Sequence, residues 1–487
     1  MPGLQRSNVI IIHPDLGIGG AERLIIDVAL ALQNRGHHVT IYTSHRDKAH
    51  CFDEARDGTL DVRVRGNTIF PAHVCGRLHI LMAALRQLHL TVSLLNELGS
   101  ADRSRPTSEK KDGSVSEEDC DDIFIVDQLP ACVPVLKTFG RPRTSRRQRI
   151  LFYCHFPDQL LARRDEDGSI LRLAKLLYRV PFDWFEGWAL SASDRVVANS
   201  RFSRGVVREV FGPTRLGDVE VVYPCVDTDS GPTIPEKKPA EALWGEKKIL
   251  LSINRFERKK DMALAIRAYH GLGTDKRRGT RLVIAGGYDN RVQENVQYHQ
   301  ELDDLAIGLG LQTATSKTVV SALSIPDSID VLFLLSVPTA FKETLLAQSK
   351  LLLYTPINEH FGIVPVEAMH AGIPVLASNT GGPLETIVEG ETGWLRDAHA
   401  VDEWTAVMNK VLYGLSQEDV DRMAAAGKAR AEREFSLTAM GDRLEKEIST
   451  MLTAERRPFH GWQQVLVMLA LSGAVLAVVV ALLLRAT

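Results

Sequence analysis

The sequence lacks several features that define common classes of protein. Its 58 Lys and Arg residues do not exceed its 61 Asp and Glu residues, and the net charge of -3 argues against general nucleic-acid binding, which needs a basic excess. The six cysteines include no C-x-x-C pair, so we expect reduced thiols and neither a zinc site nor a disulfide framework. No N-x-S/T acceptor occurs, which agrees with a chain outside the secretory lumen, although chance absence is the alternative. The N-terminus has no apolar run long enough for a signal peptide.

What the sequence does contain is an alternation of short apolar runs with longer helix-patterned stretches. At 487 residues the chain exceeds what one core usually supports, and this alternation is typical of parallel α/β domains. The runs that we predict as strands are Val9–Ile12, Val39–Tyr42, Ile123–Val126, Ile150–Tyr153, Arg195–Ala198, Val219–Tyr223, Ile249–Ile253, Leu282–Ala285, Val331–Leu335, Leu351–Tyr354 and Val375–Ala377.

A segment rich in Pro, Gly, Thr and charges, Asp227–Pro239, separates the two sets of strands and is typical of a linker. We therefore expect domains over residues 1–225 and 241–430, a linker over 226–240 and a C-terminal helix over 431–455. Two segments do not fit a compact core. Ser100–Asp122 has no apolar periodicity and predicts a disordered insertion. Leu78–Leu98 predicts a helix that packs in the fold while it exposes some apolar surface to lipid, with a membrane-contacting helix as the alternative.

The C-terminal segment Val465–Leu484 contains twenty residues without a charge. A helix of that length spans about 30 Å, the thickness of the hydrocarbon core of a bilayer. Trp462 lies where an interfacial aromatic residue belongs, and Arg456 and Arg457 precede it. A buried core helix is the alternative, but such helices rarely lack a polar face. We predict a transmembrane helix over residues 465–484.

Small residues at 17–20 follow the first predicted strand and open a helix-patterned stretch. Gly19 and Gly20 would let a diphosphate approach the backbone at the N-terminus of that helix. The pattern G-x-G-x-x-G of dinucleotide oxidoreductases requires glycine where Glu22 stands, which argues against a dehydrogenase. A tight turn with only a structural role is the alternative.

Two further motifs follow predicted strands of the second half. Arg255 and Lys260 follow Ile249–Ile253, at the strand end where an open α/β sheet binds anionic ligands. Glu359 and Glu367 follow Leu351–Tyr354 and flank a glycine-containing turn, so both could accept hydrogen bonds from sugar hydroxyls. Alone, the basic pair is equally consistent with a solvated loop, and the spacing of the two glutamates alone favours ordinary surface residues.

Together, the R-x4-K pair, the E-x7-E pair and the glycine loop resemble the retaining glycosyltransferases of family four, which have the GT-B fold of two Rossmann-like domains facing a cleft. The resemblance covers residues 8–450. Longer strings resemble the α-1,3/1,6-mannosyltransferases that assemble the dolichol-linked oligosaccharide for asparagine-linked glycosylation. These strings are HPDLGIGGAERL, FYCHFPD, YPCVD, SINRFERKKD and TPINEHFGIVPVEAM.

The resemblance implies an acceptor domain over 1–225 and a donor domain over 241–430. The donor would be GDP-mannose and the acceptor Man-GlcNAc-GlcNAc-diphosphate-dolichol, at the cytosolic face of the endoplasmic reticulum membrane. Neighbouring glycosyltransferases of the same assembly would be further partners. Two alternatives stay open, namely a transferase for another nucleotide sugar and an inactive membrane-anchored scaffold.

The resemblance also implies roles for individual residues. Arg255 and Lys260 would hold the diphosphate and stabilise the leaving GDP, Glu367 would bind the ribose, and Glu359 would contact the mannose near the reacting carbon. His155 would line the acceptor side and touch the sugar. The remaining implied donor-binding residues are Gly19, Gly20, His360, Phe361, Gly362 and Ile363.

We expect no metal cofactor, because two fixed cations can compensate the charge of the departing diphosphate. Asp165 and Asp167 form a D-x-D pattern, but it lies in a polar loop and is better interpreted as solvated charge.

Overall fold

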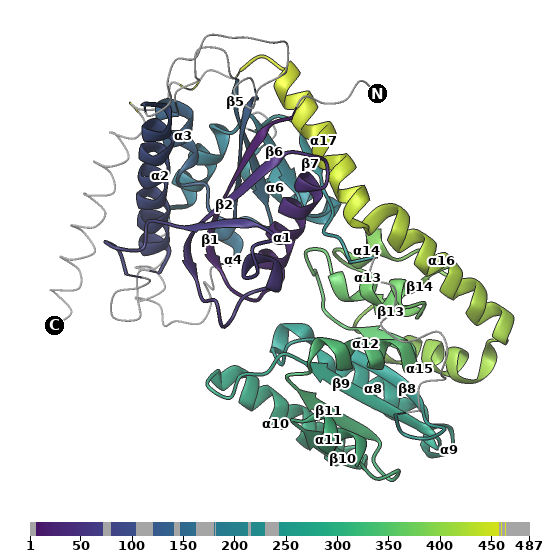
Figure 1. Ribbon diagram of the computed structural model, residues 1–487. Coiled ribbons are helices and arrows are strands. Elements are labelled where there is room, and N and C mark those ends of the chain that lie inside the picture. The colour runs from purple at the N-terminus through teal and green to yellow at the C-terminus, as the bar shows by residue number, and fades with distance from the viewer. Residues whose placement is uncertain are drawn as a thin grey trace. The chain divides into compact units, whose positions relative to one another are not determined.

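The computed structural model describes two compact units (Figure 1). The described residues are 6–71, 79–103, 120–140, 147–161, 180, 182–212, 216–228, 243–456, 459 and 463. The first unit comprises Met1–Tyr223 together with Met440–Thr487, and the second unit comprises Pro224–Ala439. The predicted transmembrane helix over 465–484, Asp165, Asp167 and most of the predicted linker lie outside the described residues.

The first unit contains a seven-stranded parallel sheet in the order β3-β2-β1-β4-β5-β6-β7. Its strands are β1 (Asn8–Leu16), β2 (His38–Arg46), β3 (Asp61–Val64), β4 (Asp122–Asp127), β5 (Gln148–Cys154), β6 (Arg195–Ala198) and β7 (Val219–Val221). Every residue of β5 is buried, which is why its sequence is an almost continuous apolar run. Its helices are α1 (Gly20–Gln33), η1 (Asp53–Ala55), α2 (His79–Arg103), α3 (Val133–Phe139), α4 (Asp158–Leu161), α6 (Arg201–Phe211) and the greater part of α17 (Leu437–Thr453).

One hydrophobic cluster joins a face of this sheet to α2, α3 and α6. Leu90 and Leu94 of α2, Leu136 of α3 and Phe211 of α6 meet alternate residues of the strands, such as Ile12. Because side chains of a strand alternate between faces, this cluster holds only those apolar residues of the strands that point to one face of the sheet.

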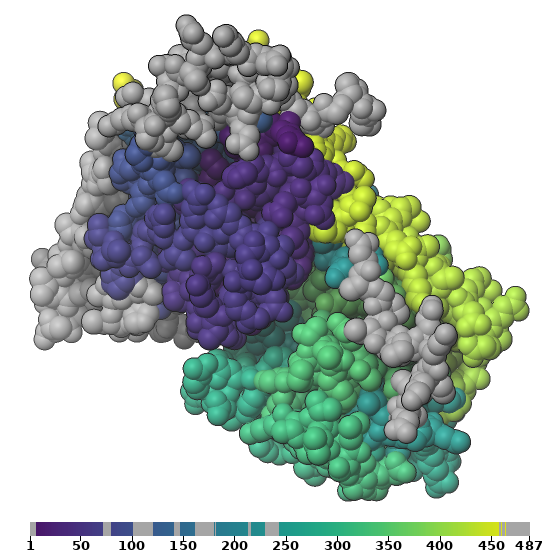
Figure 2. All heavy atoms as spheres, in the orientation of Figure 1, coloured from purple at the N-terminus to yellow at the C-terminus, as the bar shows by residue number. Residues whose placement is uncertain are grey.

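Helix α17 is held to the first unit by charged side chains. Arg149 Nε donates to the carbonyl oxygen of Met451 at 3.0 Å, and its Nη2 donates to that of Ala454 at 3.0 Å. Arg195 pairs with Glu447 at 2.6 Å, and His37 Nε2 lies 2.6 Å from Glu445 Oε1. A cation at the C-terminus of a helix satisfies its free carbonyl groups and opposes its dipole. Figure 2 shows the yellow surface of α17 beside the purple surface of the N-terminal segment.

The helix expected over 431–455 is present as α17, but it begins only at Leu437 and is separated from the preceding helix. Helix α16 (Gln417–Phe435) ends at Phe435, and Ser436 adopts an extended backbone conformation. The amide of Ala439 then donates to Ser436 Oγ at 3.1 Å, which caps the start of α17. A serine with this cap geometry breaks an otherwise continuous helical pattern.

The second unit contains another seven-stranded parallel sheet, in the order β10-β11-β9-β8-β12-β13-β14. Its strands are β8 (Lys248–Ile253), β9 (Thr280–Gly286), β10 (Thr313–Ser316), β11 (Val331–Leu335), β12 (Ser349–Tyr354), β13 (Val375–Ser378) and β14 (Gly393–Arg396). Its helices are η3 (Arg258–Lys260), α8 (Met262–Gly271), α9 (Thr274–Arg277), α10 (Gln293–Gly308), α11 (Val319–Leu323), α12 (Thr339–Gln348), α13 (Ile363–His370), α14 (Pro383–Thr386), α15 (Val401–Asn409), η4 (Lys410–Gly414) and α16.

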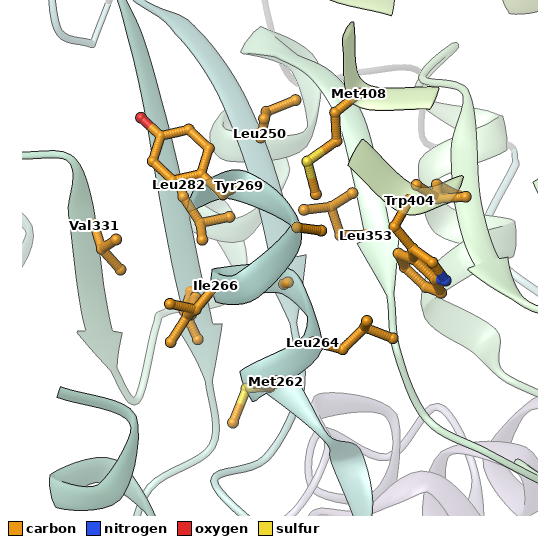
Figure 3. Packing of buried hydrophobic residues seen from close by; sticks show 14 of the residues in the cluster. Leu250, Met262, Leu264, Ile266, Tyr269, Leu282, Val331, Leu353, Trp404 and Met408 are labelled. Carbon is orange, nitrogen blue, oxygen red and sulfur yellow. The ribbon is translucent and has the colours of Figure 1, made fainter. Parts of the chain in front are cut away.

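The core of the second unit lies between this sheet and helices α8 and α15 (Figure 3). Leu250, Leu282 and Leu353 of the sheet face Tyr269 of α8 and Trp404 of α15. Trp404 is fully buried, and its indole donates to the carbonyl oxygen of Asp397 at 2.9 Å, so its one polar group is satisfied. The predicted α/β class with two Rossmann-like domains is confirmed.

The strands that the sequence did not predict lie at the edges of the sheets. They are β3, β10 and β14, each four residues long. Strand β3 has no buried residue and β10 has one, so neither strand shows an apolar run. An edge strand needs no apolar residues on both faces, and therefore carries a weaker sequence signal than a central strand.

The helix predicted over Leu78–Leu98 is confirmed as α2, although Leu78 itself lies outside the described residues. Leu90 and Leu94 are fully buried, whereas Val92 is 50% exposed. The helix continues to Arg103, so the expectation of disorder from Ser100 is wrong at its start, and residues 104–119 lie outside the described residues. Within the part of the chain that the structure describes, no helix combines the length and the apolar composition needed to cross a bilayer.

Candidate active site

The site of the second unit lies at the carboxyl ends of two neighbouring strands, β8 and β12. The strand order reverses there, because β9 lies on one side of β8 and β13 lies beyond β12. Connections that leave such a pair in opposite directions open a crevice above the sheet, which is where open α/β sheets bind ligands. Arg255 and Lys260 follow β8, and Glu359 follows β12.

Lys260 and Glu359 form an ion pair across this position, with a hydrogen bond from Lys260 Nζ to Glu359 Oε2. The backbone of Lys260 is fixed as well, because Thr355 Oγ1 donates to its carbonyl oxygen at 2.6 Å. Burial alone would raise the pKa of Glu359, but the charge and hydrogen bond of Lys260, with smaller contributions from His360 and Tyr354, hold it below its ordinary value. Glu359 is therefore an anion at neutral pH.

Tyr354, the last residue of β12, forms a second hydrogen bond to Glu359. Its buried hydroxyl hydrogen-bonds to Glu359, and burial together with the negative charges of Glu359 and Glu367 raises the pKa of Tyr354 well above its usual range. The hydroxyl thus stays protonated and donates to the carboxylate. Gly362 has a φ of 85°, and a Cβ there would lie 3.0 Å from the Tyr354 ring, so only glycine fits.

Glu367 lies within α13 and is only half satisfied by the protein. Its Oε1 accepts a hydrogen bond from Lys342 Nζ of α12 at 2.8 Å. Its Oε2 is buried and has no hydrogen-bond partner among the described residues. A buried acceptor without a donor costs about 1–3 kcal/mol. A ligand hydroxyl that reached Oε2 would remove that cost.

The loop that carries Glu359 rests on two glycines that follow β13. The amide of Gly382 donates to the carbonyl oxygen of Glu359 at 2.7 Å. A Cβ on Gly381 would lie 2.5 Å from that same oxygen, and a Cβ on Gly382 would lie 2.0 Å from the carbonyl oxygen of Phe361. Phe361 is itself buried and packs edge-on against Phe435, with ring centroids 5.6 Å apart.

The other predicted donor-binding residues of this unit lie around the same loop. Arg255 is 62% exposed, and its nearest carboxylate in the described structure is that of Glu257 at 4.0 Å. His360 contributes to the low pKa of Glu359, and Ile363 is the first residue of α13. The structure therefore brings Lys260 and Glu359 together, gives Glu367 a different lysine and leaves Arg255 directed to solvent.

In the first unit, His155 directly follows β5 and contacts a buried carboxylate. His155 Nε2 lies 3.1 Å from Asp127 Oδ2, and the histidine side chain is 20% exposed. Asp127 is the last residue of β4. It also contacts His13 of β1, whose Nδ1 lies 2.9 Å from Asp127 Oδ1. Strands β1 and β4 are the neighbours at which the order of this sheet reverses.

Gly19 and Gly20 lie at the start of α1, as the glycine-loop motif predicts. The carboxylate of Glu22 folds back over Gly19, because a Cβ on Gly19 would lie 2.2 Å from Glu22 Oε2. Gly20 faces open space. The space above Gly19 is thus occupied by a carboxylate, and Gly20 is the position at which a ligand could approach the backbone.

Several residues of these sites were missed by sequence reasoning. Tyr354 belongs to an apolar strand run, Lys342 lies in a helix without a recognisable motif, and His13 and Asp127 are isolated residues at strand ends. The Gly381-Gly382 pair directly after a predicted strand was the one signal that could have been used, because glycines at such a position indicate close backbone approach.

Known protein families and solved structures resemble this chain. Residues 233–430 match the family described as Glycosyl transferases group 1, and residues 120–230 match Glycosyltransferase Family 4. Among solved structures, the glycosyltransferase from Rickettsia africae aligns with a TM-score of 0.63 at 16% identity, over 92% of this chain and all (100%) of that one. Sucrose-phosphate synthase from Thermosynechococcus elongatus aligns with a TM-score of 0.62 at 15% identity, over 92% and 100%. The fold and the family matches define a glycosyltransferase with the GT-B fold.

Curated relatives narrow this class. The alpha-1,3/1,6-mannosyltransferase of Neurospora crassa is 50% identical over 455 residues, 92% of this chain and 91% of the relative. Those of Rhizomucor pusillus and Saccharomyces cerevisiae are 43% and 40% identical, over 90% and 94% of this chain and 90% and 88% of the relatives. The chain belongs to the α-1,3/1,6-mannosyltransferase family, which confirms the resemblance seen in its sequence.

The packing of the Glu359 loop predicts that Gly382→Ala destabilises the protein. Gly382 has an ordinary φ of -58°, so the added methyl group acts only through its overlap with Phe361. Overpacking of this kind costs about 1–3 kcal/mol, and each kcal/mol lowers the melting temperature by about 2–4 °C in a domain of this size. The matched control is Gly308→Ala at the end of α10, where a Cβ meets nothing within 4 Å. Calorimetry that found both variants equally stable would contradict the packing.

Proposed function

We propose that this chain transfers mannose from GDP-mannose, in α-1,3 and α-1,6 linkage and with retention, to Man-GlcNAc-GlcNAc-diphosphate-dolichol. The observation that carries the proposal is the Lys260–Glu359 ion pair at the point where the strand order of the second unit reverses. The names of the relatives support the sugar and the two linkages. GDP and the lipid-linked acceptor rest on the sequence motifs.

The charges of the second unit suit a nucleotide diphosphate. An ammonium group has three donors, and Lys260 uses one of them on Glu359, so two remain for phosphate oxygens. Arg255 is exposed and can bridge two phosphate oxygens with its planar guanidinium group. Negative charge accumulates on the diphosphate as it leaves, and fixed cations stabilise that charge without rearrangement.

The two carboxylates of the motif would serve different parts of the donor. Glu359 is anionic and rigidly held, so it can accept from mannose hydroxyls and stabilise positive charge near the reacting carbon. Glu367 offers its unpartnered Oε2 to the ribose hydroxyls of GDP. In the first unit, His155 is the side chain that we propose to touch the transferred sugar or the acceptor.

We propose that the reaction needs no metal. Among the described residues, no group of three His, Cys, Asp or Glu side chains is arranged to hold an ion. Support for the proposal comes from Arg255 and Lys260, whose positive charges act where a metal would act in other transferases.

We further propose that residues 465–484 anchor the chain in the endoplasmic reticulum membrane, with both units on the cytosolic side. The proposal rests on the uncharged twenty-residue segment and on the hydrophobicity of the dolichol acceptor, which places the reaction at a bilayer surface. Other glycosyltransferases of the same assembly are proposed as neighbours at that membrane.

A single donor site predicts that Lys260→Ala reduces both linkages together. A lost charge-assisted contact costs about 1.5–3 kcal/mol, which slows the reaction about ten- to over a hundredfold. The α-1,3 and α-1,6 products should fall by similar factors in an assay with GDP-mannose and the lipid-linked acceptor, and EDTA should change neither. Lys259→Ala is the matched control, because this lysine pairs with Glu257 at the surface. If Lys260→Ala lost only one linkage, the single donor site would be refuted. If EDTA abolished both linkages, the reaction would need a metal ion.

The free oxygen of Glu367 predicts a specific dependence on ribose hydroxyls. GDP should raise the melting temperature more than 2′,3′-dideoxy-GDP. Glu367→Gln should bind GDP more weakly, by about ten- to a hundredfold, because a hydrogen bond to a charged acceptor contributes about 1.5–3 kcal/mol. The variant should then no longer distinguish GDP from its dideoxy analogue, while the exposed Glu391→Gln should still do so. Equal discrimination in both variants would place the ribose elsewhere.

Deletion of residues 465–487 should release the protein from membranes without lowering its melting temperature. Val475→Arg with Val479→Arg should have the same effect at full length, since a central arginine disfavours insertion by about 2.5–3.5 kcal/mol, whereas leucine at both positions should not. Flotation with lipid vesicles measures the attachment. Unfolding of the truncated chain would show that the segment belongs to the core. Undiminished flotation would transfer the anchoring role to another surface, such as α2.

A further inference from the structure

His13 is a buried histidine whose two ring nitrogens both face hydrogen-bond acceptors. Its Nδ1 lies 2.9 and 3.0 Å from the two carboxylate oxygens of Asp127, and its Nε2 lies 3.1 Å from the carbonyl oxygen of Asp15. Carbonyl and ionised carboxylate oxygens can only accept, so both nitrogens must carry a proton. The ring is therefore an imidazolium cation, and its side chain is fully buried.

The carboxylate of Asp127 also contacts the ring of His155. Asp127 Oδ2 lies 3.1 Å from His155 Nε2, so one buried anion stands between two imidazole rings. A carboxylate at hydrogen-bond distance raises the pKa of a histidine, because it favours the charged ring. When His13 is charged, however, the His13–Asp127 pair has no net charge, so Asp127 presents no net negative charge to His155.

The other charged groups around His13 and Asp127 leave this balance intact. Beyond His155, burial raises the pKa of Glu186 to about 7, and its carboxylate accepts from the amides of Asp158 and Gln159. Glu22 of α1 acts on His13 and favours its cationic form, and Asp15 is occupied by Arg86 of α2 at 2.8 Å. Just before α3, burial and to a lesser extent Asp127 raise the pKa of Cys132 to about 12, so its thiol is neutral. The ring of Tyr153 lies tilted beside that of His155, with centroids 5.4 Å apart, and its hydroxyl donates to the carbonyl oxygen of Val222.

The titration of the pair agrees with the geometry. Burial alone would lower the pKa of His13, but Asp127 and Glu22 raise it above its ordinary value. Burial alone would raise the pKa of Asp127, but His13 and His155 hold it below its ordinary value. Both shifts favour the charged forms at neutral pH.

We propose that His13 is a positioning residue that neutralises Asp127 and thereby keeps His155 uncharged, with Nε2–H on Asp127 and the lone pair of Nδ1 presented to a hydroxyl of the sugar or the acceptor. No described protein group pairs with His155 Nδ1, and the ring is partly exposed. A neutral ring can accept from a hydroxyl, whereas an imidazolium cannot. A cation would also oppose the positive charge that develops on the sugar during glycosyl transfer. The inference rests on the proposed contact of His155 with substrate.

The pH dependence of turnover tests this role. His13→Asn places an amide near the position of Nδ1, so it can still donate to Asp127 but carries no charge. The carboxylate of Asp127 is then uncompensated and faces His155 as a net negative charge, so the acidic limb of kcat should move about 1–2 units toward higher pH. His155→Gln should lack that limb, and the exposed His50→Asn should match the wild-type profile. An unmoved limb with a uniformly lower kcat in His13→Asn would overturn the proposal.

A double variant separates the effect of the lost charge of His13 from the effect of its changed side-chain shape. His13→Asn with Asp127→Asn removes both charges, so the acidic limb should return to its wild-type position even if kcat stays low. A limb that remained displaced in the double variant would also overturn the proposal. If His155→Gln retained full activity and the wild-type profile, the proposed function of His155 would fail, whatever the charge of His13.

A measurement on the wild-type chain covers the case in which His13→Asn does not fold. Nitrogen NMR of histidine-labelled protein at about pH 8, above the ordinary histidine pKa of ~6.5, should show one ring with both nitrogens protonated. That signal should be absent from the double variant, which contains no uncompensated charge and is therefore expected to fold. A wild-type spectrum with neutral rings only would refute a cationic His13.

Discussion

Both units depend on the same constraint, which is that all the strands of a parallel sheet end at one edge. At the position where the strand order reverses, two neighbouring strands send their connections in opposite directions and leave their carboxyl ends uncovered. In the second unit this juxtaposes Lys260 and Glu359, which are 99 residues apart in sequence. In the first unit it juxtaposes His13 and Asp127, which are 114 residues apart. Charged groups can be buried at these points because each strand end supplies the partner of the other.

Charge compensation then decides how each acid can act. Glu359 accepts hydrogen bonds from Lys260 and from the Tyr354 hydroxyl and is held as an anion. Asp127 contacts two histidines and is buried. Glu367 differs from both, since Lys342 satisfies one of its oxygens and leaves the other buried without a donor. A buried acceptor without a donor at a strand-end crevice suits ligand binding.

The parts of the fold that were predictable from sequence are those with an unambiguous physical signal. A central strand such as β5 is buried on both faces, so its sequence is an apolar run, whereas β3 and β10 lie at edges and have no such run. Ser436 was missed because a single serine breaks the helical pattern only through its cap geometry, which depends on the backbone.

The candidate sites were predictable only in part, for a related reason. The pairs Arg255 with Lys260 and Glu359 with Glu367 are short-range patterns, and they can be found in the sequence. The ion pair between Lys260 and Glu359 and that between Lys342 and Glu367 join different elements, and their existence depends on how strands and helices align in space.

His13 illustrates this limit most clearly. In sequence it is a single histidine at the end of an apolar run, the position at which a structural role is the default interpretation. Its charge follows from the register of β1 on β4, in which Ile12 pairs with Val126 and the next residues are His13 and Asp127. A slip of one strand by one residue would turn its side chain to the opposite face of the sheet and leave the other buried group without its partner. The register that packs the core of the first unit is thus the same feature that sets the charge beside His155.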